Sequence, residues 1–222
     1  MRHAPPVVVL SGGMDSATAL AFTVALYGSA QTLTVNYGQR HARELSAAET
    51  QAGQFAARHD QVDLTEVGAL LEGSSLTDDV DVPRGHYSDA TMAATVVPNR
   101  NAILANVAAG IAVARKAPAI VLGVHAGDHP IYPDCRPEFV SALNDLLAVA
   151  SDHRVRVEAP FLHTDKAGIL RIGHALGVDY AATWTCYVGE DLACGTCGSC
   201  TERLEAFDVI GRDDPLPYQN TT

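Results

Sequence analysis

Short apolar runs alternate with longer amphipathic segments along most of the chain, and polar or glycine-rich stretches separate them. Five of these runs are rich in β-branched and aliphatic residues and predict strands, over residues 7–10, 32–37, 62–64, 119–124 and 154–160. The segments between them predict helices, over residues 17–26, 43–58, 102–115, 138–150 and 165–176. Strands that alternate with helices at this rhythm predict an α/β fold, in which helices cover both faces of a parallel five-stranded sheet.

Two stretches depart from this rhythm. Residues 66–97 are rich in Gly, Ser, Asp and Pro and are too long for an ordinary connection, so we interpret them as a functional loop or lid. Cysteines dominate the end of the chain, which predicts an α/β domain over residues 1–183 and a small C-terminal segment over residues 184–222. We expect the tail after Gly211, which contains Pro and Asp, to be loose.

Composition and charge narrow the class of protein. The 222 residues are 47% hydrophobic and 18% charged, which is typical of a folded domain with a substantial core. The formal net charge is -11 and no basic stripe offsets it, which argues against a large nucleic-acid footprint. No apolar run approaches the roughly 18 residues of a membrane span, and residues 1–6 do not resemble a signal peptide. We therefore expect a cytoplasmic protein without a membrane partner.

The turn after the first predicted strand reads Ser-Gly-Gly-Met-Asp-Ser, from Ser11 to Ser16. Glycines allow a backbone to close around an anion, and the helix that follows presents unpaired N–H groups and the positive end of its dipole. The turn therefore suits a phosphate, although the lysine and the glycine spacing of the Walker loop are missing. The alternative is an ordinary turn between a strand and a helix.

This turn resembles the loop of the PP-loop ATP pyrophosphatases. The resemblance implies cleavage of ATP between its α- and β-phosphates, with transfer of AMP to an oxygen of the substrate. It also implies that Asp15 helps to place Mg²⁺ or orients the loop. On the same basis the residues expected to bind ATP are Leu10, Ser11, Gly12, Gly13, Met14, Asp15, Ser16, Ala17, Thr18, Ala19 and Leu20.

Four of the five cysteines follow the spacing C-x7-C-x2-C-x2-C, and they are Cys186, Cys194, Cys197 and Cys200. In a reducing compartment, clustered thiols favour a metal over disulfides. Four thiolates leave no open coordination position, so we expect one structural Zn²⁺ per chain. The alternatives are an iron–sulfur cluster, which some tRNA-thiolating PP-loop enzymes carry, and four unligated thiols.

Further motifs are more specific. The stretches Asn-Tyr-Gly-Gln-Arg-His from Asn36, Val-Pro-Asn-Arg-Asn from Val97, Tyr-Pro-Asp-Cys-Arg-Pro from Tyr132 and Thr-Cys-Tyr from Thr185 resemble the QueC family of 7-cyano-7-deazaguanine synthases. The resemblance implies a Rossmann-like fold of the adenine nucleotide alpha hydrolase type and a homodimer. It also implies a carbon–nitrogen ligase that converts 7-carboxy-7-deazaguanine, ammonia and ATP into the nitrile through the primary amide. The chain contains no glutaminase motif, so free ammonium or a partner must supply the nitrogen.

Candidate residues follow from these motifs. The predicted catalytic residues are Asp15, Ser16, Arg100 and Lys166. The predicted substrate-binding residues are Gln39, Arg40, Asn101, Asp128, Tyr132, Asp134, Cys135 and Arg136. Arginines suit phosphate or carboxylate groups, and an aspartate suits the guanine-like edge. The alternatives are solvated loop side chains, a lysine that only begins a helix and, for Cys135, a buried loop thiol. We interpret His41, His125 and His129 as scaffold residues rather than bases.

Two loops differ from the family pattern. Asn99 stands where the family usually has Gly, and Gly-Asp-His-Pro-Ile precedes the Tyr-Pro-Asp-Cys motif in place of a Phe-Ser-Gly sequence. We expect both differences to face the substrate, which leaves open a variant that stops at the amide. A PP-loop tRNA-modifying enzyme and a nucleotide-binding regulatory domain are the remaining alternatives.

Overall fold

The computed structural model describes residues 4–39, 43–77, 81–85, 93–128, 130, 132–189 and 191–219. At its centre lies a five-stranded sheet in the order β3-β2-β1-β4-β5, in which every pair of neighbours is parallel. The strands are β1 (Val7–Val9), β2 (Gln31–Asn36), β3 (Arg58–Asp63), β4 (Ala119–Val121) and β5 (Arg156–Glu158). The predicted parallel sheet of five strands is thus confirmed.

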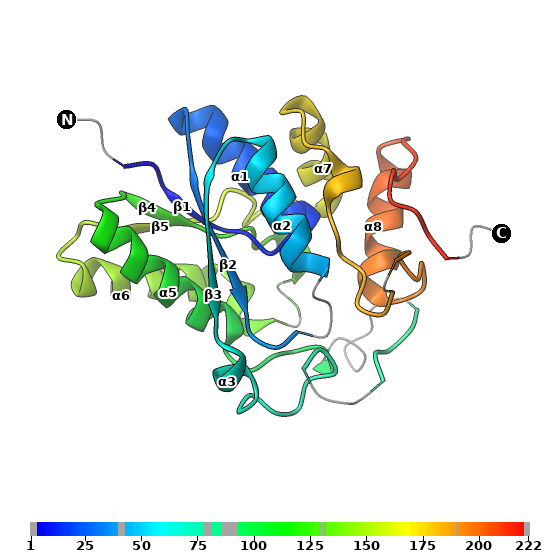
Figure 1. Cartoon of the computed structure of the whole chain (residues 1–222), viewed down its shortest axis with the longest axis horizontal. Coiled ribbons are helices and arrows are strands. Elements are labelled where there is room, and N and C mark those ends of the chain that lie inside the picture. Colours follow the sequence, from blue (N-terminus) through cyan, green and yellow to red (C-terminus); the bar gives the residue numbers. More distant parts are fainter. Residues whose placement is uncertain are drawn as a thin grey trace.

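Helices cover both faces of the sheet (Figure 1). One layer contains α1 (Met14–Tyr27), α2 (Arg43–Gln54) and α7 (Lys166–Ala175), and the other contains α5 (Arg100–Arg115) and α6 (Pro137–Ala150). Successive strand residues point to opposite faces, so Val7 packs in the core beneath α5 and Val8 packs in the core beneath α1. Strands that are apolar on both faces are what a doubly covered parallel sheet requires.

Short elements complete the α/β unit. They are α3 (Thr65–Gly68) and three 3₁₀ turns, η1 (Ala126–Asp128), η2 (Pro133–Cys135) and η3 (Tyr180–Ala182). Throughout the described ranges, no helix combines the length and apolar composition needed to cross a bilayer.

The structure corrects the helix predicted over residues 43–58. The helix α2 ends at Gln54 because Ala56 adopts a left-handed conformation with φ 49°, and the chain then enters β3 at Arg58. The six residues of β3 are mostly polar, since this strand lies at the edge of the sheet. The hydrophobic pattern therefore predicted a strand only over residues 62–64, which overlaps β3 at Val62 and Asp63.

The C-terminal segment folds as a further helix, α8 (Gly198–Val209), which the sequence did not predict. Ala206 and Phe207 of α8 pack in one cluster with Met14 of α1 and Leu170 of α7. The fully buried Arg203 donates to Thr183 Oγ1 at 2.6 Å and to the Tyr180 carbonyl at 2.9 Å, so α8 is hydrogen-bonded to residues that precede Arg203 by 20 and 23 positions. The domain boundary after residue 183 stays a prediction.

The tail is not loose over its described part, contrary to expectation. Leu216 is 4% exposed, and the backbone of Ala193 exchanges hydrogen bonds with Pro217 and Gln219 at 3.0 and 2.8 Å. The tail is held because Asp214 forms an ion pair with Arg203 at 2.7 Å inside the protein. Leu216 and Tyr218 of the tail therefore pack against the cysteine cluster.

The glycine-rich stretch 66–97 reaches two other parts of the molecule. Leu76 and Thr95 border the main pocket, and the Gly85 N–H donates to the Thr196 carbonyl at 2.7 Å. Residues 78–80 and 86–92 lie outside the described residues. The role of this stretch as a lid stays a prediction.

Candidate active site

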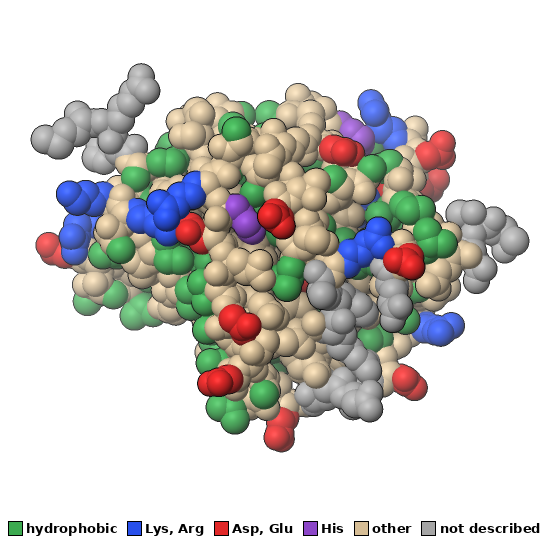
Figure 2. Space-filling model, viewed as in Figure 1, with side chains coloured by type: hydrophobic (Ala, Val, Ile, Leu, Met, Phe, Trp, Pro, Cys, Tyr) green, Lys and Arg blue, Asp and Glu red, His purple; other side chains and the backbone are tan. Residues whose placement is uncertain are grey.

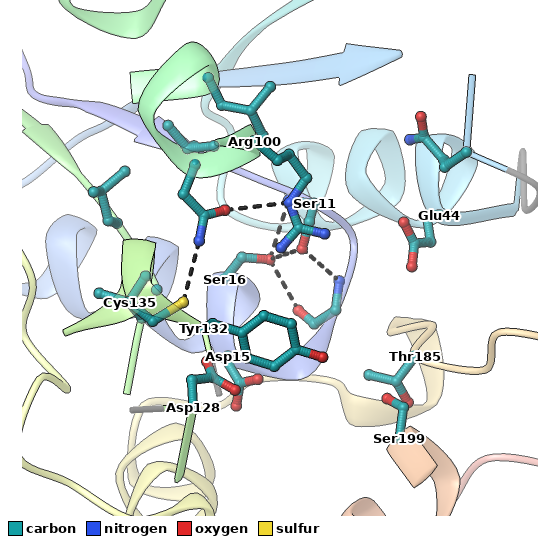
Figure 3. Close-up of a pocket in the computed structure, with 18 of the residues that line it drawn as sticks. Ser11, Asp15, Ser16, Glu44, Arg100, Asp128, Tyr132, Cys135, Thr185 and Ser199 are labelled. Atoms are coloured by element: carbon teal, nitrogen blue, oxygen red, sulfur yellow. Dashed lines mark hydrogen bonds between the residues drawn. The ribbon is translucent and has the colours of Figure 1, made fainter. Parts of the chain in front are cut away.

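A pocket of about 230 Å³ opens at the carboxyl ends of β1, β2 and β4 (Figure 3). The chain leaves β1 toward β2 on one side and later returns to β4 on the other, so the crevice lies where the strand order reverses. Open parallel sheets bind their ligands at this position. The fold thus places the pocket beside the glycine turn that follows β1.

The glycine turn is held by its own hydroxyls and by close backbone packing. Ser16 Oγ donates to the Gly13 carbonyl at 3.1 Å and accepts from the Ser11 N–H at 3.2 Å. Gly12 has φ 92°, and a Cβ at this position would lie 2.2 Å from the Glu44 carbonyl oxygen. Gly123 after β4 also packs against the turn, although less tightly, since its Cβ would lie 3.1 Å from the Ser16 backbone nitrogen. The turn therefore packs between α2 and the end of β4, and its last three residues form the start of α1.

A cluster of charged side chains gathers around Asp15 of this turn. Lys166 Nζ, in the first turn of α7, lies 2.6 Å from Glu202 Oε2 and 3.5 Å from Asp15 Oδ2. The buried His125 places its Nε2 3.7 Å from Asp15 and 3.5 Å from Asp128. Three carboxylates from distant parts of the sequence thus surround one ammonium group and one imidazole.

Burial and charge act against each other in this cluster. Burial by itself lowers the pKa of Lys166, but the carboxylates of Asp15, Glu202 and Asp128 outweigh it, and the pKa is raised. Lys166 is therefore a fixed positive charge. Burial raises the pKa of Asp128 despite the nearby His125 and Lys166. Glu44 of α2 also borders the pocket, and burial raises the pKa of its carboxyl group to about 7, so this group changes charge near neutral pH.

The remaining polar lining of the pocket includes aromatic, amide and thiol side chains. Tyr132 Oη and Thr95 Oγ1 are 2.6 Å apart, and Asn101 Nδ2 donates to the Cys135 sulfur at 3.1 Å. Burial raises the pKa of the Cys135 thiol, which keeps it protonated. Arg100 donates to Tyr37 Oη at 3.4 Å. A flat ring with polar edges fits such a lining.

The structure brings most of the predicted site residues to this pocket. Those that border it are Leu10, Ser11, Gly13, Asp15, Ser16, Gln39, Arg100, Asn101, Asp128, Tyr132, Cys135 and Lys166. Those of α1 that lie inside the protein below the turn are Met14, Ala17, Thr18, Ala19 and Leu20. Arg40 lies outside the described residues.

Gly12, Asn99, Asp134 and Arg136 do not border the pocket either. Asp134 instead accepts from the Asn101 N–H at 2.9 Å, where it caps the first turn of α5. Arg136 donates to the Pro130 carbonyl at 3.3 Å. Asn99 also stands apart from the lining, contrary to expectation, and has φ 55° and ψ 21°. Gly and Asn are the residues that adopt this left-handed conformation most readily, which explains why one stands for the other.

Sequence reasoning missed several lining residues, among them Tyr37, Glu44, Thr185, Ser199 and Glu202. Tyr37 lies in the Asn-Tyr-Gly-Gln-Arg-His motif and Thr185 begins the Thr-Cys-Tyr motif, so the sequence motifs could have indicated both residues. Glu202 follows Cys200 by two residues and had no such signal, because α8 itself was not predicted.

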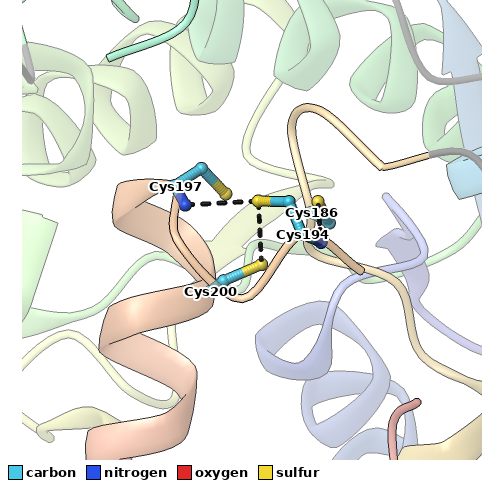
Figure 4. Close-up of side chains that lie close together, drawn as sticks. All are labelled: Cys186, Cys194, Cys197 and Cys200. Atoms are coloured by element: carbon cyan, nitrogen blue, oxygen red, sulfur yellow. Dashed lines mark hydrogen bonds between the residues drawn. The ribbon is translucent and has the colours of Figure 1, made fainter. Parts of the chain in front are cut away.

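The four clustered cysteines converge as predicted (Figure 4). All are buried, and their sulfur atoms lie within 4.8 Å of one another. Cys186 accepts backbone hydrogen bonds from Gly189 at 3.0 Å and Cys194 at 3.2 Å. Hydrogen bonds from the Cys197 and Cys200 thiols, together with those from the N–H groups of Cys194 and Val188, hold the pKa of Cys186 well below its usual range. Such a group of sulfurs can hold a metal ion.

Comparison of the sequence with known proteins identifies the family to which the chain belongs. A family profile described as "Queuosine biosynthesis protein QueC" matches residues 5–211. The chain belongs to the QueC family. The 7-cyano-7-deazaguanine synthase of Marinobacter nauticus is 51% identical over 213 residues, which are 96% of each chain. That of Pseudoalteromonas atlantica is 49% identical over 96% of this chain and 98% of its own. The predicted family and the enzyme class of its named members, a carbon–nitrogen ligase, are confirmed.

Solved structures resemble the QueC chain in fold. NMN synthetase from Francisella tularensis gives a TM-score of 0.54 at 13% identity, covering 95% of this chain and 79% of that one. U34-tRNA thiolase NcsA from Methanococcus maripaludis, with its [4Fe-4S] cluster, gives 0.52 at 16% identity, covering 93% and 65%. At these identities the likeness shows the fold alone, and it confirms the α/β architecture.

Proposed function

We propose that this QueC-family chain is an ATP-dependent ligase that converts 7-carboxy-7-deazaguanine and ammonia into 7-cyano-7-deazaguanine. The observation that carries the proposal is that one pocket is bordered both by residues of the glycine turn before α1 and by Tyr132, Asn101 and Cys135. Relatives about half identical over nearly their whole length bear the name of this activity.

The chemistry explains the need for ATP. A carboxylate is a poor electrophile because its leaving group would be an oxide, whereas an acyl adenylate releases AMP. Ammonia then forms the amide, and adenylation of the amide oxygen allows loss of AMP and a proton to give the nitrile. Each activation releases pyrophosphate, so the balance is two ATP per nitrile.

The residues of the pocket suit these steps. We assign pyrophosphate binding to the backbone and hydroxyls of Ser11 to Ser16, at the N-terminus of α1. Lys166 offsets phosphate charge during transfer of AMP. Asp15 Oδ1 is buried without a hydrogen-bond partner among the described residues, which fits a carboxylate that holds the Mg²⁺ accompanying ATP. Asn101 and Tyr132 contact the deazaguanine ring, and Asp134 keeps Asn101 in place.

The cysteine cluster fits one structural Zn²⁺. A tetrahedral zinc with Zn–S bonds of about 2.3 Å separates its sulfurs by about 3.8 Å. The sulfurs of Cys194 and Cys200 are 4.0 Å apart. An iron–sulfur cluster of several ions would hold its cysteines farther apart. Cys135, the one cysteine outside the cluster, is a protonated buried thiol, which supports free ammonium or a partner protein as the nitrogen source.

The surface supports a small-molecule substrate. On the face shown in Figure 2, Lys and Arg side chains lie in separate places with acidic side chains between them. A net charge of -11 also disfavours a polyanion such as tRNA. We retain the cytoplasmic location and the homodimer as parts of the proposal, and light scattering of the purified protein tests the latter.

A time course followed by mass spectrometry tests the function. Protein supplied with 7-carboxy-7-deazaguanine, ammonium, ATP and Mg²⁺ should form the amide transiently and then the nitrile, with AMP and pyrophosphate as the nucleotide products. Asp15→Ala should abolish both products while the protein stays folded. ADP and phosphate as the only nucleotide products, or an amide that accumulates and is not consumed when resupplied, would contradict the proposal.

A further inference from the structure

Thr185 carries a polar group that the protein leaves unsatisfied. The residue is 9% exposed and borders the pocket, yet its Oγ1 has no hydrogen-bond partner among the described residues. Buried hydroxyls are almost always hydrogen-bonded, because an unpaired one bears the cost of its lost hydration. An orphaned hydroxyl at the edge of a ligand pocket therefore indicates a group supplied by a ligand.

Thr185 is fixed beside the glycine turn. The N–H of the preceding Trp184 donates to the Gly12 carbonyl at 2.9 Å, and Gln51 Nε2 donates to the same oxygen at 2.7 Å. A Cβ added to Gly13 would lie 3.6 Å from Thr185 Cγ2. The residue before the first metal-site cysteine thus forms a wall of the turn to which we assign the pyrophosphate.

The first turn of α8 borders the same pocket as Thr185. This helix has twelve residues, and no side chain caps its N-terminus at Cys197. Ser199 in its first turn is 7% exposed and borders the pocket. Figure 3 shows the Thr185 and Ser199 oxygens turned toward each other at the pocket edge. The unpaired N–H groups of a first helical turn attract anions, and here a second such terminus lies near that of α1.

We propose that Thr185, Ser199 and the first turn of α8 bind the terminal phosphoryl groups of the nucleotide, opposite the glycine turn. The cysteine-bearing segment then completes the nucleotide site in addition to stabilising the fold. Asp15, Asp128 and Glu202 border the same pocket, so the ligand is a phosphoryl group that brings a divalent cation rather than a bare anion. The inference rests on the proposed use of ATP.

Equilibrium binding of Mg²⁺-pyrophosphate to the zinc-loaded protein tests the site without turnover. Thr185→Val preserves shape and removes the hydroxyl, so its affinity for pyrophosphate should fall about tenfold, as expected for one hydrogen bond to a charged group. Binding of AMP should not change. Ser199→Ala should weaken pyrophosphate in the same way, and Thr185→Ser should restore it.

Thr201→Val is the matched control, because Thr201 lies on the same helix and its hydroxyl donates to the Cys197 carbonyl at 3.2 Å. This variant should bind pyrophosphate like the wild type. Wild-type affinity in both Thr185→Val and Ser199→Ala would overturn the inference, as would an equal loss of AMP and pyrophosphate binding. If the wild type forms no nitrile but Thr185→Val still weakens pyrophosphate selectively, the nucleotide site stands and the proposed function fails.

Discussion

Asp214 offers the sharpest test of how the C-terminal segment is held. Its side chain is 2% exposed and pairs with Arg203, which is fully buried. The carboxylate accepts from Arg203 Nε at 2.7 Å, Arg203 Nη2 at 2.8 Å, Tyr218 Oη at 2.6 Å and the Leu216 N–H at 3.0 Å. Replacing Asp214 with Ala removes all four acceptor contacts and leaves a buried guanidinium with two neutral partners.

The expected cost follows from this arrangement. Hydrogen bonds to charged groups contribute about 1.5–3 kcal/mol each, but they are not additive, and removing one partner of a buried ion pair typically costs about 3–5 kcal/mol. We therefore expect Asp214→Ala to lower the free energy of unfolding by about 4 kcal/mol. For a chain of this length, that loss lowers Tm by roughly 10 °C.

Urea unfolding followed by circular dichroism measures the loss, with Asp213→Ala as a matched control because Asp213 is exposed on the same turn of chain. The double variant Arg203→Met/Asp214→Ala should recover part of the stability, since it removes the uncompensated charge. If Asp214→Ala unfolds within about 1 kcal/mol of the wild type, the buried pair does not hold the segment and the reasoning fails.

Three further changes test the site. Gly12→Ala should weaken ATP binding more than tenfold, because a Cβ at φ 92° would meet the Glu44 carbonyl, and an unchanged affinity in calorimetry would disprove the close fit. Cys197→Ser should lose the metal and several kcal/mol of stability, whereas elemental analysis showing one zinc per chain in that variant would exclude the four-sulfur site. Burial raises the pKa of Glu44 from 4.5 to about 7, so the folded protein holds this proton more tightly than the unfolded chain and loses stability as pH rises through that window. Glu44→Gln should therefore gain about 1–3 kcal/mol relative to the wild type between pH 5 and pH 8, and a gain independent of pH in urea titrations would contradict the assignment.

The sequence by itself determined the parts of this protein that depend on neighbours along the chain. The apolar run at Val7–Val9 followed by Ser-Gly-Gly predicted a buried strand and an anion-binding turn, because β-branched residues favour strands and glycine permits φ 92° at Gly12. The cysteine spacing predicted convergent sulfurs for a similar reason, since short spacings keep thiols close whatever the rest of the fold does.

Tertiary structure decided which side chains share the pocket. Glu202 meets Lys166, 36 residues away, and Thr185 lies beside Gly13, because α8 packs against α7 and Trp184 bonds to Gly12. It also turned Asp134 away from the pocket, toward the backbone of Asn101. Local patterns encode backbone conformation, but the direction in which a polar side chain points depends on partners brought close only by packing, and those partners leave no periodic signal in the sequence.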